Sequence, residues 1–313
     1  MIKSKTIFMV VIGAVLALIL WGVLLMMQRE NNTGSQQSAH QKTSINALSI
    51  EHDIAPASVL SAAQVDTKIV ITGLGVAGAD ISLLDRRNKV ATTKVSGEGK
   101  WALSFVKDEQ VETIKLDLLM ATTDGQETMS DQSIFILSEQ KPIVNVGEEA
   151  VIPKPLSLIL LTAPGLNSRI LQSHFEAFPH KDGLALETID YDNSGGVIFS
   201  GTSDRLGKVS IYAGLNRIGE SHVGSDGRWS LIFGNILQLG EYEITVELMP
   251  KDGGEIIRIT VPFARMRPLF ETEGSPKILV QFKENHIQMG HALHRGGYQY
   301  VVVYSSLALK EKL

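Results

Sequence analysis

The sequence predicts a mainly β protein in which one β-sandwich module occurs twice behind an N-terminal transmembrane helix. Three observations predict this class. An uncharged apolar run occupies residues 7–27, and a gapless internal repeat relates residues 72–105 to residues 200–233. Within each copy, apolar and polar residues alternate as they do in half-buried strands.

The composition excludes several classes of function. The 313 residues include 29 Lys and Arg against 34 Asp and Glu, for a formal net charge of −5. They form no basic cluster of the kind that nucleic-acid-binding proteins present. Cysteine is absent, so no disulfide, thiol nucleophile or cysteine-ligated zinc is possible. No nucleic-acid partner, cofactor or metal ion is expected.

Residues 7–27 predict a transmembrane helix. Every face of such a helix would be apolar, and its length would be about 31 Å, close to the thickness of the hydrocarbon core. A cleaved signal peptide is the alternative, but its apolar region is shorter and a small-x-small site follows it. Here Gln28, Arg29 and Glu30 follow the run directly, so an uncleaved anchor is favoured.

Flanking charge predicts the orientation of this anchor. Lys3 and Lys5 precede the helix and only Arg29 closely follows it, so residues 1–6 are expected in the cytoplasm. The chain would then be a single-pass protein of the bacterial inner membrane with its bulk in the periplasm. Residues 28–65 are rich in Ser, Gln, Asn and Thr, and are expected to form a flexible linker.

The repeat has a constant offset of 128 residues. Gly73 matches Gly201 and Trp101 matches Trp229, with no gap between them. In each copy a glycine-containing turn precedes the tryptophan, and the strand that follows places Trp, Leu and Phe on one face. Both tryptophans are therefore expected in sandwich cores, and not as sugar-stacking residues at the surface.

The repeat also sets the expected domain boundaries. Short strands separated by regular turn signals are typical of a β-sandwich. The expected order is module 1 at residues 66–137, a proline-rich linker with one strand at 138–182, module 2 at 183–263, a second linker at 264–276, and a C-terminal segment at 277–313.

Two resemblances extend this interpretation. The module pattern, in which Gly-Lys-Trp or Gly-Arg-Trp opens a late strand, resembles bacterial immunoglobulin-like modules of envelope proteins. Residues 278–307 resemble the first two-thirds of a LysM module, through Val280-Gln281, a helix-like segment, Gly296-Gly297 and Tyr300 to Tyr304. The whole order of anchor, linker, two modules and terminal segment resembles alphaproteobacterial membrane-anchored LysM-domain proteins.

This resemblance implies a short α+β LysM-like remnant that binds N-acetylglucosamine-containing glycan such as peptidoglycan. The residues that it implies for glycan contact are Glu284, Asn285, Ile287 and Tyr300. The segment departs from the family where Lys283 to Ile287 replace a Gly-Asp-Ser-Leu-Trp-like turn. The final strand of a LysM module would fall beyond Leu313, so the remnant is expected to be degenerate and truncated.

Two further polar groups are interpreted as structural. His286, His291 and His294 lie on a segment expected to be helical, and are interpreted as surface histidines because a metal needs further rigid ligands. Asp190 to Gly195 partly resembles a calcium loop. Its twelfth position is Gly201 where a bidentate Glu is required, so a turn built on side-chain hydrogen bonds is favoured.

The expected function is non-catalytic. The chain would tether the inner membrane to peptidoglycan through its LysM-like tip. The alternative is a protein-interaction or scaffold module of envelope assembly, in which the C-terminal segment completes a sheet and binds no glycan. The sequence contains no Gly-x-Ser-x-Gly elbow, phosphate-binding loop or HExxH motif, so an enzyme such as a wall hydrolase is a distant third class.

Overall fold

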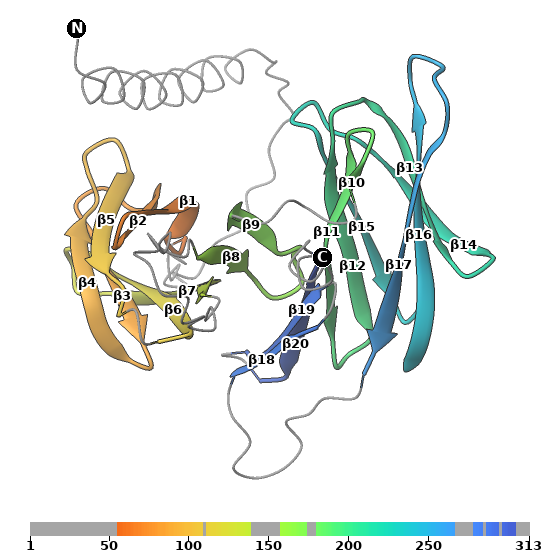
Figure 1. The fold of residues 1–313 in the computed structure, drawn as a ribbon. Coiled ribbons are helices and arrows are strands. Elements are labelled where there is room, and N and C mark those ends of the chain that lie inside the picture. The colour runs from red at the N-terminus through yellow and green to blue at the C-terminus, as the bar shows by residue number, and fades with distance from the viewer. Residues whose placement is uncertain are drawn as a thin grey trace, which may run out of the picture. The chain divides into compact units, whose positions relative to one another are not determined.

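The computed structural model describes residues 55–108, 111–138, 157–173, 180–266, 278–283, 286–293 and 296–304. These residues belong to one compact unit that begins at Asp53. Throughout them the regular structure consists of antiparallel β-strands, without an α-helix (Figure 1). The prediction of a mainly β protein is therefore confirmed.

The predicted transmembrane helix at residues 7–27 lies outside the described residues, as do residues 1–6 and residues 28–54 of the predicted linker. In the part of the chain that the structure describes, no helix could cross a membrane. The linker boundary at residue 65 is wrong, because residues 58–65 form the first strand of the fold. Val59 and Ala62 of this strand are buried, which a flexible linker would not allow.

In the described residues, the first sandwich consists of a three-stranded outer sheet packed on a six-stranded inner sheet. The outer sheet has the order β1-β2-β5, and the inner sheet has the order β4-β3-β6-β7-β8-β9. The strands are β1 (Ser58–Val65), β2 (Lys68–Leu74), β3 (Asp80–Asp85), β4 (Asn88–Lys94), β5 (Lys100–Val106), β6 (Thr113–Ala121), β7 (Glu127–Leu137), β8 (Leu158–Thr162) and β9 (Arg169–Gln172). Ile71 from the outer sheet and Leu83 and Leu118 from the inner sheet share one buried core.

The second sandwich also has two sheets over the remaining described strands, but the repeat equivalents of the first outer sheet, β12 and β15, lie in its inner sheet. Its inner sheet has the order β15-β12-β11-β20-β19-β18, with β10 also paired to β11, and its outer sheet has the order β14-β13-β16-β17. The strands are β10 (His180–Lys181), β11 (Leu184–Asp192), β12 (Gly196–Ser203), β13 (Gly207–Ala213), β14 (Asn216–His222), β15 (Arg228–Gly234), β16 (Gly240–Pro250), β17 (Ile257–Arg265), β18 (Ile278–Phe282), β19 (His286–Ala292) and β20 (Tyr298–Tyr304). Phe199, Ile211 and Val246 lie in its core.

The internal repeat is preserved in the packing of the two tryptophans. Trp101 pairs with Gly73 across β2 and β5, and Trp229 pairs with Gly201 across β12 and β15. Each indole N–H donates to a backbone carbonyl oxygen, of Leu74 at 3.0 Å in one sandwich and of Thr202 at 3.2 Å in the other. Both tryptophans are 3% exposed, so the prediction that they are core residues is confirmed.

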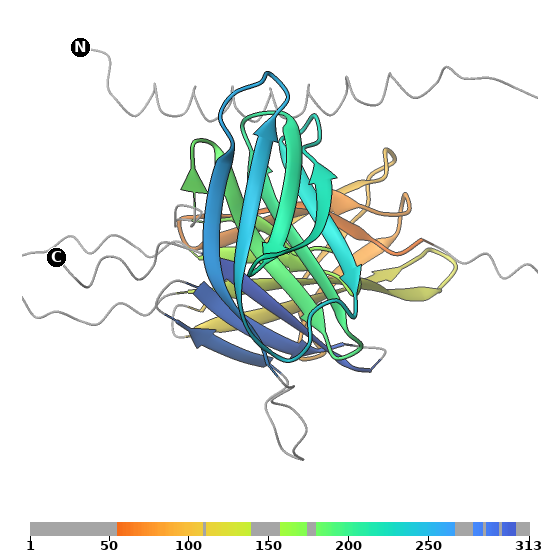
Figure 2. The same ribbon diagram turned by 90° about the vertical axis from the view of Figure 1, so that its right-hand side faces the viewer.

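The two inner sheets pack against each other and enclose a third core. Phe135, Leu137, Leu158 and Leu160 from the first sandwich meet Ile287, Met289, Val301 and Val303 from the second. All five residues of β8 and the last six residues of β20 are buried, because both faces of these strands are covered. The described strands therefore form four layers, and the region predicted as a linker between separate modules supplies part of the central core (Figures 1 and 2).

The C-terminal segment corrects the expectation of a short α+β remnant. Its described residues form three antiparallel strands, β18 to β20, with no helix among them. β20 pairs with β11, so the blue strands continue the green inner sheet in Figure 2. The helix expected around His286 and His291 is instead the strand β19, since backbone pairing on both sides overrides local propensity.

Candidate functional site

Polar side chains gather on the face of β11 that lies opposite the core of the second sandwich. Ile189 and Tyr191 point into that core. Thr188 and Asp190 point the other way, toward the loop at residues 163–168 that joins β8 to β9. This face joins the two sandwiches, because the loop belongs to an inner-sheet connection of the first sandwich and β11 belongs to the second.

In the first sandwich the corresponding pair of hydroxyl side chains lies on an exposed surface. Ser61 pairs with Thr72 in β1 and β2, and their hydroxyl oxygens lie 2.7 Å apart on an exposed surface. The equivalent pair in the second sandwich is Thr188 and Ser200, also 2.7 Å apart, but both residues are buried. The second copy of the repeat therefore differs from the first because the loop and β20 cover this face of its sheet.

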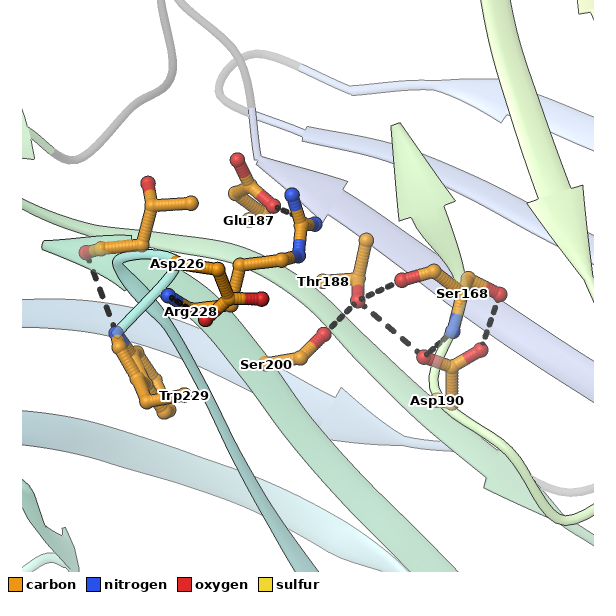
Figure 3. A network of polar contacts seen from close by, with 9 residues as sticks. Ser168, Glu187, Thr188, Asp190, Ser200, Asp226, Arg228 and Trp229 are labelled. Carbon is orange, nitrogen blue, oxygen red and sulfur yellow. Dashed lines mark hydrogen bonds and ion pairs between the residues drawn. The ribbon is translucent and has the colours of Figure 1, made fainter. Parts of the chain in front are cut away.

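Asp190 is the centre of the covered face (Figure 3). The backbone N–H of Ser168 donates to its Oδ2 at 2.9 Å, and the Ser168 hydroxyl donates to its Oδ1. Gln299 of β20 donates to Oδ1 at 3.2 Å, and the Thr188 hydroxyl donates to Oδ2 at 3.3 Å. These donors connect the loop, β11 and β20 through one carboxyl group that is 2% exposed.

Burial raises the pKa of Asp190 from 3.8 to about 6, and the donated hydrogen bonds oppose this rise. A carboxyl group whose folded-state pKa is raised stabilises the fold most at low pH. Its contribution is lost as the pH rises through the folded-state pKa. Asp190 thus makes the junction between the sandwiches sensitive to pH.

We expect replacement of Asp190 to change how stability depends on pH. The advantage of the natural chain over Asp190→Asn in free energy of unfolding should shrink by up to about 3 kcal/mol between about pH 4 and pH 7. Urea denaturation followed by tryptophan fluorescence at several pH values measures this difference. Asp204→Asn, at an exposed aspartate outside the network, is the control. Equal pH profiles for the natural chain and Asp190→Asn would rule out this role.

A second polar group lies beside the first on the same sheet (Figure 3). Arg228 forms an ion pair with Glu187 at 3.0 Å, and the side chain of Glu187 is 14% exposed. Burial raises the pKa of Glu187, and the positive charge of Arg228 opposes that rise. Because Arg228 directly precedes Trp229, the ion pair also links the start of β15 to β11 across the intervening strand β12.

A shallow hollow opens next to Asp190. Its lining is mainly apolar and includes Pro164, Ile198, Ile232 and Leu293, and its polar lining residues include Asp190, Asp192 and Gln299. The Asp190 carboxyl group and the side-chain N–H of Gln299 are engaged in the network that joins the loop, β11 and β20, whereas Oε1 of Gln299 is buried without a hydrogen-bond partner. The geometry therefore suits a structural junction, with fixed donors around one carboxyl group.

Two of the four residues implied for glycan contact, Ile287 and Tyr300, are buried. Glu284 and Asn285 lie outside the described residues. Ile287 is 1% exposed in the central core, and Tyr300 is 2% exposed and stacks on Tyr191 with ring centroids 4.9 Å apart. The assignment of Ile287 and Tyr300 to a glycan site is therefore wrong, because both side chains fill cores between sheets.

The histidine and turn interpretations have different outcomes. His291 is 2% exposed and lies 4.8 Å from the ring of Phe135, so it is not a surface residue, and His294 lies outside the described residues. The Asp192 carboxylate accepts the backbone N–H groups of Ser194, Gly195 and Gly196, each at 2.9 Å. This confirms the predicted turn. No set of three His, Cys, Asp or Glu side chains in the described residues could hold a metal ion.

Sequence reasoning did not single out the network around Asp190. One signal was present, because Thr188 and Asp190 interrupt the apolar sequence of β11 on a single face. Their burial depends on Ser168 and Gln299, which lie 22 and 109 residues away from Asp190. No local pattern reports contacts at such separations.

Comparison with known proteins adds no family to this description. No protein family model matches the chain. No curated protein matches it significantly.

Proposed function

We propose that this chain is a non-catalytic scaffold of the bacterial cell envelope, anchored in the inner membrane by residues 7–27 with its sandwiches in the periplasm. The position of β18 to β20 carries the proposal. β20 pairs with β11, β19 pairs with β20 and β18 pairs with β19, and side chains of these strands pack in two cores. A segment whose strands β19 and β20 lie inside a sheet suits a scaffold better than a glycan-binding tip, which favours protein interaction over direct tethering to peptidoglycan.

Rigid attachment between the sandwiches supports a scaffold role. The central core and the hydrogen bonds from Ser168 to Asp190 join the two sandwiches over a broad area. We expect these contacts to limit movement of one sandwich relative to the other. Preorganisation of this kind reduces the entropy lost when two partners bind, and anchoring in a membrane raises their effective concentration.

Peptidoglycan sedimentation tests the proposal against its main rival. The full chain in detergent is mixed with insoluble peptidoglycan and centrifuged, beside a sample without wall polymer. We expect no saturable sedimentation of the chain with the polymer. Saturable sedimentation that soluble N-acetylglucosamine oligomers compete away would overturn the scaffold proposal and restore glycan tethering.

Photo-cross-linking in cells provides the positive arm of the same test. A photoreactive residue replaces Ile232, which is 62% exposed on β15, and the matched control carries it at Val301, which is 0% exposed. A scaffold is expected to yield discrete protein adducts from position 232 and none from position 301. Absence of adducts from position 232 would remove this face from the proposal.

A further inference from the structure

We propose that the hollow beside Asp190 binds a lysine side chain of a partner protein. The polar residues that line the hollow are described first, then its charge and its size. The inference names the chemistry of the partner, and it rests on the proposed scaffold function for the existence of that partner. The hollow itself can be tested with a small probe that needs no partner protein.

Gln299 supplies a buried acceptor in the lining of the hollow. Its Nε2 donates to Oδ1 of Asp190 at 3.2 Å, which fixes the orientation of the amide, because the opposite orientation would place its oxygen against the carboxyl group. The Oε1 atom of Gln299 is buried without a hydrogen-bond partner, and the residue is 4% exposed. Buried acceptors are nearly always bonded in folded proteins, so this oxygen indicates a donor from outside the chain.

Asp192 supplies a second acceptor in the same lining. Its Oδ1 accepts the backbone N–H groups of Ser194, Gly195 and Gly196, whereas its Oδ2 accepts no hydrogen bond from the residues that the structure describes. Gly196 leaves space beside this oxygen, since a Cβ atom there would lie 3.0 Å from Oδ2. A ligand donor can therefore reach Oδ2 without displacing the donors of the turn.

The charge of the hollow is negative. Burial raises the pKa of Asp190 to about 6, so this carboxyl group is mostly ionised at pH 7 and above. Its two oxygens already accept four hydrogen bonds, which fills their usual capacity. Asp190 therefore contributes charge to the hollow, while Gln299 and Asp192 contribute acceptors.

Basic side chains of the described residues do not neutralise this charge. Neither Asp190 nor Asp192 is among the aspartates that form ion pairs within that part of the chain. Arg265 donates to the backbone carbonyl oxygens of Asp192 and Leu237, and it does not line the hollow. A cation from a partner is therefore the complement of this charge.

The size and lining of the hollow select a lysine side chain. Its volume is about 140 Å³, whereas pockets for whole small-molecule ligands measure about 300–1,000 Å³. An aliphatic stem can lie along Pro164, Ile198 and Leu293, and an ammonium group offers three donors to the two acceptors. The aspartates would repel a carboxylate or a phosphate, and an apolar ligand would leave Oε1 of Gln299 without a partner. Ile232, which is 62% exposed, extends the apolar lining to the surface where a partner would contact it.

The probe for the site is n-butylammonium chloride, because it carries the ammonium group and the four-carbon stem of lysine. The full chain in detergent is titrated with it at pH 8 in phosphate buffer, and saturation-transfer NMR of the probe reports binding. We expect saturable binding with a Kd on the order of 1–10 mM for so small a ligand. 1-Butanol, which has the same stem but no charge, should bind about tenfold more weakly or worse.

Two variants test the proposed acceptors. Asp192→Asn removes the charge while its amide oxygen can still accept the bonds of the turn, and it should weaken butylammonium binding by about fivefold or more. Gln299→Met removes the buried acceptor and should have a similar effect. Asp124→Asn is the matched control, because Asp124 accepts the backbone N–H of Gln126 in a turn of the first sandwich, and it should leave binding unchanged. Circular dichroism checks that each variant is folded.

A capped Ala-Lys-Ala peptide distinguishes a partner lysine from a free amine. We expect the peptide to bind at least as tightly as butylammonium. Binding of butylammonium without binding of the peptide would overturn the lysine assignment. Absence of saturable butylammonium binding, equal binding of 1-butanol, or unchanged binding by folded Asp192→Asn would overturn the site itself. These results would leave the scaffold proposal untouched, since photo-cross-linking tests it separately.

Discussion

Removal of residues 278–313 is expected to abolish stable folding of the second sandwich and to destabilise the first. The deletion takes Tyr300, Val302 and Tyr304 from the second core and Ile287, Met289, Val301 and Val303 from the central core. Burial of each such side chain contributes about 1.5–3 kcal/mol. The total is on the order of 10–20 kcal/mol, which exceeds the usual stability of about 5–15 kcal/mol for a whole domain.

The measurement is limited proteolysis and urea denaturation of the truncated chain beside the natural one. A point variant avoids the change in length: Val301→Asp buries a charge in the central core, whereas Val106→Asp at a position 64% exposed is the control. We expect Val301→Asp to reproduce the protease sensitivity of the deletion. If the truncated chain kept a cooperative transition of natural midpoint, the C-terminal strands would be an independent appendage, as the LysM resemblance implied.

The central core explains which parts of the fold the sequence could predict. The strands of each module can be predicted from the alternation of apolar and polar residues and from the matched tryptophans. This is because one face of most of these strands is exposed to solvent or carries polar residues. β8 and β20 are covered on both faces, so their apolar runs lack any period. An apolar run without a period does not show which strands cover it, so the strand expected within residues 138–182 was assigned to a linker although β8 lies in the central core.

The candidate site was less predictable than the fold for a related reason. The Asp192 turn was recognised because its acceptor and donors lie within four residues. Asp190 obtains its hydrogen-bond partners only in the folded chain, where Ser168 of the β8–β9 loop and Gln299 of β20 lie beside it. The assignment of Ile287 and Tyr300 failed similarly, because the burial of both residues depends on the pairing of β20 with β11, more than 100 residues earlier in the chain.

Gly201→Ala is expected to destabilise the second sandwich by about 3 kcal/mol or more, the upper range for overpacking a core. A Cβ atom at this position would lie 2.0 Å from the carbonyl oxygen of Ala185 and 2.7 Å from Cζ2 of Trp229. The oxygen is part of the β11 backbone, so relief requires a shift of the strand that carries Asp190. Urea denaturation of the full chain, monitored by circular dichroism, measures the loss.

Gly234→Ala is the matched control, since a Cβ there meets nothing within 4 Å and the strand pairing is the same. It should leave stability unchanged or raise it by about 0.4–1 kcal/mol, because alanine restricts the unfolded chain. The repeat adds a second test: Gly73→Ala places its Cβ 2.0 Å from the Ser58 carbonyl oxygen and should destabilise the first sandwich by a similar amount.

The double variant Gly201→Ala, Trp229→Phe separates the clash with the Trp229 ring from the clash with the Ala185 carbonyl oxygen. A smaller ring relieves only the contact with the indole, so stability should recover in part, and full recovery would show that the backbone of β11 is free to move.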